Sequence, residues 1–239
     1  MGDTLRSPTI FTKLQRIAQQ AVERPDMIFQ TLAHLINVEF LTEAFRRTRK
    51  DGATGVDRVT ADQYAEHLET NLQNLHERLR TGTYKALPVR RAWITKEDGK
   101  KRPLGIPAFE DKVVQRAAQM VMNAVYERDF CEVSYGYREG RSPHQALDCL
   151  RSRVQGMGIK WVIDADISGF FDCIDHRMLV TMIRQRINDG ALIKLIGKWL
   201  HAGVLEAGQI TFPDQGTPQG GLCKALHKES LCEVKNYAK

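Results

Sequence analysis

The sequence predicts an α+β fold in which helices pack on a small antiparallel sheet. Apolar residues recur at helical spacing in a series of segments between residues 26 and 202. The segments 89–107 and 204–212 each have a glycine-containing turn between strand-like flanks, as β-hairpins do. The short apolar run 161–163 has the composition of a buried strand. These patterns predict helices and a small sheet within one chain.

Composition bounds the size and class of the protein. Its 239 residues and 27.2 kDa allow one large domain, or one domain with an extension. Hydrophobic residues make up 42%, enough for a packed core, which excludes a wholly disordered chain. Lysine and arginine outnumber the acidic residues by 35 to 29, and the net charge of +6 favours a polyanionic partner such as nucleic acid.

Cysteine usage and hydropathy indicate the compartment. The five cysteines are odd in number and include no CxxC pair, which argues against a disulfide framework or zinc site and favours a reducing compartment. The N-terminus has no apolar core of signal-peptide length, and no apolar run approaches the roughly 18–20 residues of a membrane span. We therefore expect a soluble, cytoplasmic protein without a membrane partner.

The N-terminal part is expected to become helical after residue 25. Residues 1–24 show no strong pattern, whereas apolar spacing predicts a helix over 26–50. The basic end of this helix, 46–50, fits either ordinary complementation of the helix dipole or contact with RNA.

A loop and a second helix follow. The stretch 51–60 carries two glycines and two aspartates and is expected to be a loop. Thr60 and Gln63 have the spacing of a capping box, which begins a helix with leucines at helical spacing. Gly82 suits the end of that helix.

A strongly basic hairpin is predicted at 89–107. Trp93 and Ile94 indicate the first strand, and Asp98-Gly99 is a turn signal. The turn and its flanks carry four cations, which are Lys96, Lys100, Lys101 and Arg102. They fit either a solvated hairpin tip or a ribbon that faces phosphate groups.

A helix with a broad apolar face at 109–130 precedes a loop rich in arginine and tyrosine. Within 134–147, Arg138 and Arg141 are interleaved with two tyrosines and two glycines. Such a loop fits contact with a nucleic-acid backbone, and equally a structural turn held by salt bridges. Ser142-Pro143 then begins a helix that we expect to run to about residue 154.

The stretch 160–176 gathers most of the residues that could carry chemistry. Its predicted strand leads into four carboxylates and two aromatic residues, which are Asp164, Asp166, Asp172, Asp175, Phe170 and Phe171. The end of a rigid strand is a common position for chemistry, and clustered carboxylates suit Mg²⁺. The same acids also fit structural roles: Asp164 in a turn, Asp172 in an ion pair, and Asp175 as the N-cap of the next helix.

The last third combines helices, a hairpin and a glycine-rich turn. Helices are predicted at 176–188 and 190–202, and a hairpin at 204–212 with Ala207-Gly208 at its turn. The chain then reaches 215–221, where bare glycine backbone can approach a ligand closely.

Four of these motifs, in this order, resemble the reverse transcriptases encoded by bacterial group II introns, the intron maturases. They are RPLGIP at 102–107, SYGYREGRS at 134–142, DADISGFFDCIDH at 164–176 and GTPQGG at 216–221. The resemblance covers about residues 35–221 and includes the N-terminal segment KDGATGVDRVTADQY. Each motif alone is weak, but their joint order and spacing are specific.

The resemblance implies a right-hand polymerase fold with fingers and an incomplete palm. It divides the chain into an N-terminal extension at 1–58, reverse transcriptase fingers and partial palm at 59–221, and a divergent C-terminal tail at 222–239. The activity that it implies is RNA-directed DNA polymerisation, a nucleotidyl transfer.

The resemblance also implies roles within 160–176. Asp166 matches the catalytic carboxylate that binds both Mg²⁺ ions, and Phe171 matches the aromatic residue that stacks under the incoming sugar and blocks a 2′-hydroxyl. Asp164, Asp172 and Asp175 would then be structural or act indirectly. Two Mg²⁺ ions about 3.5–4 Å apart stabilise the attacking and leaving oxygens in phosphoryl transfer.

Other matched positions would contact nucleotide and RNA. Arg102 and Lys96 match fingers residues that hold the triphosphate, and Gln219 matches a residue beside the incoming nucleotide. Arg138 and Arg141 fall in the segment close to the template. The implied partners are group II intron RNA, an RNA template with its DNA primer, and dNTP.

The chain departs from the family pattern after Gly221. The family continues with a serine-proline step, an apolar palm helix and a Tyr-Ala-Asp-Asp box, whereas this sequence reads LCKALHKESLCEVKNYAK. One carboxylate cannot preorganise two divalent ions, so we expect a truncated reading frame that is inactive by itself. Without the strands that flank the 161–163 strand in the family, we also expect a poorly stable fragment.

Two other functions remain open from the sequence. The N-terminal extension and basic fingers could bind intron RNA without polymerising, and such binding would weaken steeply with salt. Asp164 and Asp166 after an apolar strand also match, superficially, the DxD signature of haloacid-dehalogenase-like phosphotransferases. That family has its motif near the start of a long domain, whereas only about 75 residues follow Asp164 here.

Overall fold

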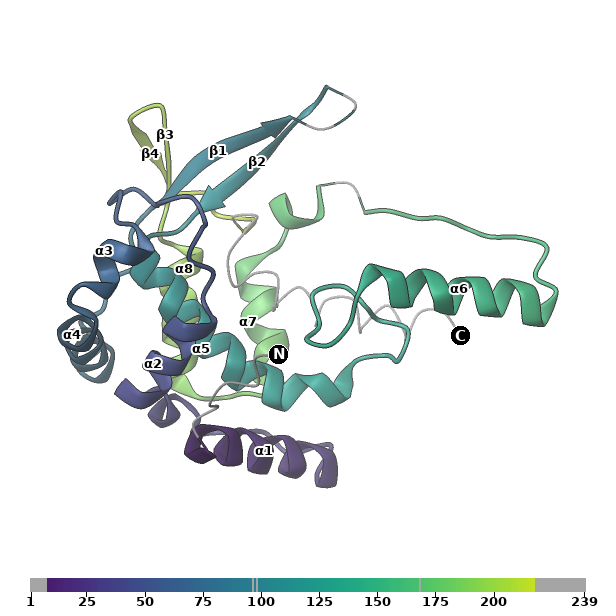
Figure 1. The fold of residues 1–239 in the computed structure, drawn as a ribbon, viewed down its shortest axis with the longest axis horizontal. Helices are drawn as coiled ribbons and strands as arrows, with labels where there is room; N and C mark the ends of the chain where they lie inside the picture. Colours follow the sequence, from purple (N-terminus) through teal and green to yellow (C-terminus); the bar gives the residue numbers. More distant parts are fainter. Residues whose placement is uncertain (1–7, 96, 98, 168, 218–239) are drawn as a thin grey trace.

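The computed structural model describes residues 8–95, 97, 99–167 and 169–217, which form helices around one small sheet (Figure 1). The α-helices are α1 (Pro8–Glu23), α2 (Val38–Arg47), α3 (Ala61–Ala65), α4 (Leu68–Arg80), α5 (Phe109–Tyr126), α6 (Pro143–Met157), α7 (His176–Arg184) and α8 (Gly190–Leu200). The strands are β1 (Val89–Thr95), β2 (Lys101–Ile106), β3 (Val204–Glu206) and β4 (Gln209–Thr211). Single 3-10 turns are η1 (Ala33–Leu35), η2 (Glu127–Asp129) and η3 (Phe170–Asp172).

Helix α5 forms the centre of the hydrophobic core. Its inward side chains include Val113, Val114, Ala117, Val121 and Val125, which are fully buried. Helices α1 and α2 both pack on α5, and α4 packs on α2. Burial of each valine contributes about 1.5–3 kcal/mol to the stability of the fold. The helix predicted at 109–130 is therefore a main source of core stability, and α1 and α2 assemble on it.

The helix predicted over 26–50 is correct only in its second half. Phe29 forms a parallel β-bridge with Ile187, which holds this part of the chain in an extended conformation. Helix α2 begins after Asn37, whose side-chain oxygen accepts a hydrogen bond from the Phe40 amide at 2.9 Å. An N-cap of this kind sets the start of a helix more firmly than apolar spacing does.

The single helix predicted after Thr60 is two helices. The capping box is confirmed, because the Gln63 amide donates to the Thr60 hydroxyl and the Thr60 amide donates to the Gln63 side chain. Helix α3 ends after one turn, and the Asn71 amide group donates to the Tyr64 carbonyl at 2.9 Å across the break. Gly82 follows α4 with a φ of +74°, as predicted for a residue that ends a helix.

The sheet has the strand order β2-β1-β3-β4. The hairpin predicted at 89–107 is confirmed, with Trp93 opposite Pro103 and Ile94 opposite Arg102. The hairpin β3–β4 is also confirmed, and Ala207 and Gly208 both have positive φ, as a tight hairpin turn requires. The prediction of an antiparallel sheet needs one correction, because β1 and β3 run parallel. Their pairing joins two hairpins that are far apart in the sequence.

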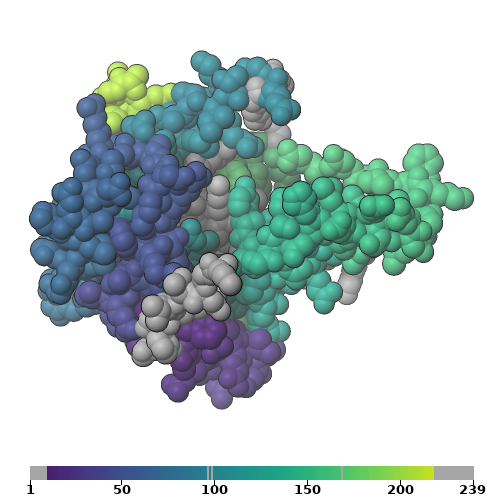
Figure 2. Space-filling view, in the orientation of Figure 1, coloured from purple at the N-terminus to yellow at the C-terminus, as the bar shows by residue number. Residues whose placement is uncertain are grey.

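The strand predicted at 161–163 is wrong. These residues form no strand, and Trp161 and Ile163 are 88% and 93% exposed. A strand needs a neighbour to accept and donate its backbone hydrogen bonds, and none of β1 to β4 lies beside this segment. Helix α6 and the segment 159–167 instead project from the body of the molecule (Figures 1 and 2).

Within the described residues, the structure contains no helix that is both long and apolar enough to cross a membrane.

Candidate functional site

Two motifs far apart in the sequence meet just after the segment 159–167. They are the phenylalanine motif, which contains Phe170 and Phe171, and the start of the glycine-rich turn at 215–217. The Thr217 amide donates to the Phe171 carbonyl at 2.7 Å, and the Gly216 amide donates to the Ile174 carbonyl at 2.8 Å. The His176 ring nitrogen Nε2 lies 2.7 Å from the Gly216 carbonyl oxygen. These contacts place the entry to the glycine-rich turn directly beside Phe171, and we call them the 171–217 junction.

Gly216 is required at this junction by both its conformation and its surroundings. Its φ is +82°, in the region that disfavours residues with a Cβ atom. A Cβ atom at this position would lie 2.8 Å from the Asp172 carbonyl oxygen and 3.0 Å from the Phe171 carbonyl oxygen. The sequence predicted close approach to a ligand here, and the structure shows close approach to the chain's own backbone.

Phe170 and Phe171 lie in a short 3-10 turn that is held by backbone hydrogen bonds. Gly169, with a φ of +63°, precedes η3, and the Asp172 amide donates to the Gly169 carbonyl at 2.9 Å. The two phenylalanine rings meet edge to face with centroids 5.6 Å apart. Asp175 is confirmed as the N-cap of α7, because its carboxylate accepts a hydrogen bond from the Met178 amide at 2.8 Å.

The predicted metal ligand lies outside this junction. Asp166 is exposed and belongs to the extended segment, as does Asp164 two residues earlier. Alternate residues of a strand project to the same side, so a strand conformation of this segment would place the two carboxylates together. One or two carboxylates with water suit a single Mg²⁺. Among the described residues, no group of three or more histidine, cysteine or acidic side chains is arranged to hold a metal.

The basic hairpin is anchored to the rest of the sheet and keeps its tip exposed. Arg102 is exposed on β2. Trp93 on β1 donates its indole hydrogen to the Glu206 carboxylate at 2.8 Å, which ties the hairpin to β3. Lys96 and Gln219, the other residues predicted to contact nucleotide, lie outside the described residues. The structure therefore places Phe171 at the junction and Arg102 on the hairpin, two separate parts of the described chain.

The two arginines of the 134–142 motif have different environments. Arg138 is buried; its guanidinium pairs with Glu127 at 2.8 Å and donates to the carbonyls of Cys131 and Ser134. Arg141 is exposed and lies over the Tyr135 ring, 5.4 Å from its centroid. Of the two roles that the sequence allowed for this loop, the contacts of Arg138 support the structural turn held by a salt bridge. RNA contact by either arginine stays a prediction.

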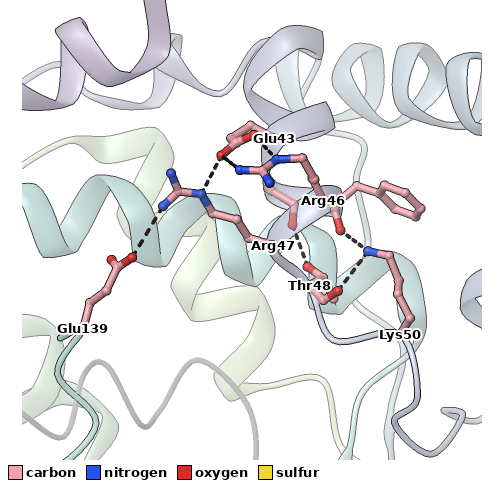
Figure 3. A network of polar contacts seen from close by, with 8 residues as sticks. Glu43, Arg46, Arg47, Thr48, Lys50 and Glu139 are labelled. Carbon is pink, nitrogen blue, oxygen red and sulfur yellow. Dashed lines mark hydrogen bonds and ion pairs between the residues drawn. The ribbon is translucent and has the colours of Figure 1, made fainter. Parts of the chain in front are cut away.

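The basic residues at the end of α2 form a network of ion pairs and hydrogen bonds (Figure 3). Glu43 is 6% exposed and accepts hydrogen bonds from Arg46 and Arg47 at 2.6–2.9 Å, which lower its pKa to about 2. Arg47 also lies 3.8 Å from Glu139 in the arginine-rich loop. Lys50 donates to the Thr48 carbonyl at 2.8 Å and to the Phe45 carbonyl, and its ammonium lies 3.7 Å from the Phe45 ring centroid.

This network supports the interpretation of the basic residues as a helix terminus. Arg46 and Arg47 bind the buried carboxylate of Glu43, and Lys50 donates to carbonyls at the end of α2, where a cation complements the negative end of the helix dipole. Arg47 was the residue whose role sequence reasoning missed, because its partner Glu139 is about 90 residues away in the chain.

A cavity of about 180 Å³ lies between the junction and the sheet. Arg91 of β1, Asp172, Gly203 and Gln215 are among the residues that line it. The Thr217 hydroxyl, which also borders the cavity, is buried without a hydrogen-bond partner within the described structure. The cavity therefore connects the phenylalanine motif, the glycine-rich turn and the first strand of the basic hairpin.

Sequence comparisons identify related proteins over most of the chain. The profile of the family described as reverse transcriptase (RNA-dependent DNA polymerase) matches residues 94–224. The protein YkfC of Escherichia coli (strain K12) is 38% identical over 91% of this chain and 59% of its own length. The group II intron-encoded protein LtrA of Lactococcus lactis subsp. cremoris is 37% identical over 89% of this chain and 36% of its own length. The chain thus spans between about a third and three fifths of these relatives.

Comparison with solved structures supports the fold. A chain of a partial Cas6-RT-Cas1–Cas2 complex matches 84% of this chain and 33% of its own length, with a TM-score of 0.51 and 21% identity. At this identity the likeness concerns the fold alone. It agrees with the α+β arrangement of polymerase fingers and part of a palm that the sequence predicts.

Proposed function

The chain belongs to the reverse transcriptase family, with group II intron-encoded proteins among its relatives, and we propose that it forms the fingers and part of the palm of an intron-encoded RNA-directed DNA polymerase. The observation that carries the proposal is the 171–217 junction, which brings the phenylalanine motif and the glycine-rich turn together. In this proposal, residues 1–58 are an N-terminal extension and 59–221 the fingers and partial palm.

Phe171 and Arg102 would act on the incoming nucleotide. The aromatic ring of Phe171 is half-buried beside the turn that leads to Gln219, so it suits a flat contact with a sugar. Arg102 on the exposed hairpin, together with Lys96, would neutralise the triphosphate, because a guanidinium can bind phosphate oxygens in pairs. Positioning and charge neutralisation supply most of the catalysis in phosphoryl transfer.

Asp166 would hold Mg²⁺, with Asp164 beside it once the segment adopts a strand conformation. When bound, the ion would neutralise phosphate charge. These two carboxylates fit one ion with its waters rather than two ions. We therefore propose that the 239-residue chain needs further carboxylates to polymerise and is inactive alone.

A primer-extension assay with an RNA template, DNA primer, dNTP and Mg²⁺ tests the inactivity. We expect no synthesis above background by the purified chain. Sustained synthesis would contradict it while supporting the polymerase assignment.

Binding of a primed RNA template tests the assignment itself. We expect Arg102→Ala to weaken binding of template with dNTP, and Lys194→Ala, a cation on α8, to leave it unchanged. Failure of the chain to bind a primed template at any salt concentration would contradict the proposed function.

A second candidate is a non-catalytic fragment that binds intron RNA in a reducing, cytoplasmic compartment. The observations that favour it are the exposed cationic hairpin and a carboxylate pair, Asp164 and Asp166, that among the described residues is too small a group for two ions. A steep fall of affinity with salt, equal for intron RNA with and without a primer, would support this function over polymerisation.

A further inference from the structure

Glu139 connects the arginine-rich loop at 134–142 to the C-terminal end of α2 (Figure 3). The Arg47 guanidinium lies between two carboxylates. Its Nε atom donates to the buried Glu43 at 2.6 Å, and its Nη1 atom lies 3.8 Å from Glu139. The side chain of Glu139 is 73% exposed. Arg47 therefore has one partner inside the fold and a second partner on the surface.

A second arginine lies within the field of these charges. Helix α2 packs on α5, which carries Arg116. Burial lowers the pKa of the Arg116 guanidinium, while the charge of Glu139 raises it and that of Arg47 lowers it. Arg116 donates to the neutral side chain of Gln119 at 2.8 Å, a contact that brings no compensating charge. The surface beside Glu139 therefore holds two partly buried cations, whose charges water screens less than those of exposed side chains.

The loop fixes the backbone of Glu139 but leaves its side chain free to turn. The guanidinium of Arg138 is held by an ion pair and by two backbone carbonyls. The Arg141 amide donates to the Arg138 carbonyl at 3.2 Å, which closes a turn with Glu139 as its second residue. An ion pair made by so exposed a carboxylate is weak and is screened by salt. The carboxylate can therefore leave Arg47 by rotation of its own side chain, while the turn stays closed.

We propose that Arg47, supported by the charge of Arg116, binds one phosphate of a nucleic-acid backbone, and that Glu139 occupies this site until nucleic acid displaces it. This inference rests on the proposed function and adds to it a site with a built-in competitor. A guanidinium forms charge-assisted hydrogen bonds with phosphate oxygens, and its planar fork can bind two of them at once. Glu139 opposes the phosphate twice, because it occupies the guanidinium and repels the incoming negative charge.

The surroundings of the site favour nucleic acid over an acidic protein segment. Arg141, two residues after Glu139, is exposed and lies over the Tyr135 ring, 5.4 Å from its centroid. A surface that combines cations with an aromatic ring suits a backbone phosphate and a neighbouring base together. An acidic peptide would use the cations alone.

Fluorescence anisotropy of a labelled RNA template annealed to a DNA primer tests the site at low salt. The probe is used without dNTP, so the measurement does not report triphosphate binding. We expect Glu139→Gln to lower the dissociation constant about three- to fivefold, the effect of losing one exposed charge pair. Glu132→Gln is the matched control, because it removes the same charge from an exposed residue seven positions earlier and should have little effect. The difference between the two variants should fade as salt is raised.

Arg47→Gln distinguishes a local site from a general effect of charge. Glu43 keeps both hydrogen bonds from Arg46, at 2.8 and 2.9 Å, so this variant should remain folded. It should weaken binding and reduce the salt slope by about 1, as the loss of one phosphate contact does. In the Arg47→Gln background, Glu139→Gln should gain no more than Glu132→Gln does. Arg116→Gln, which removes only the supporting charge, should weaken binding less than Arg47→Gln.

Several results would overturn the site and leave the proposed function standing. They are equal effects of Glu139→Gln and Glu132→Gln in the parent chain, an undiminished gain in the Arg47→Gln background, and competition by polyglutamate as effective as that by unlabelled RNA at equal charge concentration. The first comparison holds whether or not Arg47→Gln folds, and circular dichroism confirms that the glutamate variants are folded. Failure of the parent chain and of Glu139→Gln to bind the probe at low salt would overturn the site and the proposed function together.

Discussion

Gly216 shows how a single missing side chain brings two motifs together. Its backbone passes so close to Asp172 and Phe171 that a Cβ atom would overlap their carbonyl oxygens, and its φ of +82° is itself unfavourable for other residues. Gly208 has a similar φ of +84° but has nothing within 4 Å of the corresponding position. Comparing Gly216 with Gly208 therefore separates the free-energy cost of a positive φ from the cost of a close contact with neighbouring backbone.

We predict that Gly216→Ala destabilises the chain more than Gly208→Ala does. Gly208→Ala should cost about 1 kcal/mol, the price of a left-handed conformation. Gly216→Ala should cost about 2 kcal/mol more, because the surrounding backbone must shift. Urea unfolding measures both. Equal losses would show that the junction is not closely packed at this position.

Arg138 and Arg141 are three residues apart and are predicted to differ in what their loss affects. Arg138→Ala leaves Glu127 and two carbonyls without their donor, so it should lower the melting temperature by several degrees. Arg141→Ala should leave the melting temperature unchanged. If Arg141 contacts RNA phosphate, its loss should reduce the salt slope of RNA binding by about 1. A stable Arg138→Ala variant with an intact loop would contradict the structural role.

At the scale of elements, Asp189 is the residue that joins the chain before η1 to α8. Its buried carboxylate accepts hydrogen bonds from the Leu32 and Ala33 amides at 2.5 and 2.8 Å, and from the Ala191 and Leu192 amides at 2.9 and 3.0 Å. One side chain therefore caps α8 and holds the chain entering η1. Although burial alone would raise the pKa of Asp189, these amide donors together lower it.

We predict that Asp189→Asn costs about 2–4 kcal/mol at neutral pH, because an amide cannot accept four hydrogen bonds. Since the folded-state pKa is lowered, the stabilisation is present above the unfolded-state pKa and is lost as the pH falls through the folded-state value. Stability at neutral and acidic pH should therefore differ less in the variant than in the parent chain. Asp175→Asn should cost well under about 1 kcal/mol, because an asparagine oxygen can still accept the single Met178 amide that caps α7.

The elements show which sequence signals were sufficient. Caps and turns were predicted well, such as Thr60 with Gln63 and the turn at Ala207-Gly208, because they depend on neighbours in the chain. The strand at 161–163 was wrong because a strand depends on a partner that local sequence does not contain. Helix α1 was missed although its buried residues Ile10, Ile17 and Ala21 recur at helical spacing, a local signal that predicts the side of the helix that packs against α5.

In the candidate site, too, local sequence predicted some features and could not predict those that depend on distant residues. The residue types of the phenylalanine motif and the glycine-rich turn predicted their importance, but the junction between them rests on hydrogen bonds across 40 or more residues. No local pattern predicts which carbonyl His176 or Thr217 will contact. The burial of Arg138 was equally hidden, since exposed and buried arginines in a glycine-containing loop have the same sequence signature.

For the molecule as a whole, Asp111 connects three parts of the core. Its carboxylate, 3% exposed, accepts hydrogen bonds from the Tyr84 hydroxyl after α4 and from the Leu87 amide before β1. Trp199 of α8 donates its indole hydrogen to the Tyr84 oxygen at 3.0 Å. Burial outweighs these donors and raises the pKa of Asp111 to about 6.

A raised carboxyl pKa predicts that the contribution of Asp111 to the stability of the fold decreases as the pH increases from about 4 to about 6. The unfolded-state pKa is 3.8, so the contribution of Asp111 is fully present below about pH 4 and is lost as the pH rises to about 6. A shift of about two units corresponds to roughly 3 kcal/mol. We expect Asp111→Asn to be less stable than the parent chain at pH 4 and at least as stable at pH 7, so that the two profiles cross.

Glu110→Gln, at the adjacent position of α5, is the control for this crossing. Glu110 pairs with Arg78 at 2.7 Å near the surface, so its loss should lower stability at both pH values. The decline between pH 4 and 6 should remain, reduced only slightly, because burial contributes more to the raised pKa of Asp111 than the Glu110 charge does. Urea unfolding at half-unit steps of pH measures the three profiles. If the decline persists in Asp111→Asn with the same slope, it comes from other carboxyl groups, and the buried Tyr84–Asp111 contact does not set the acid–base behaviour of this core.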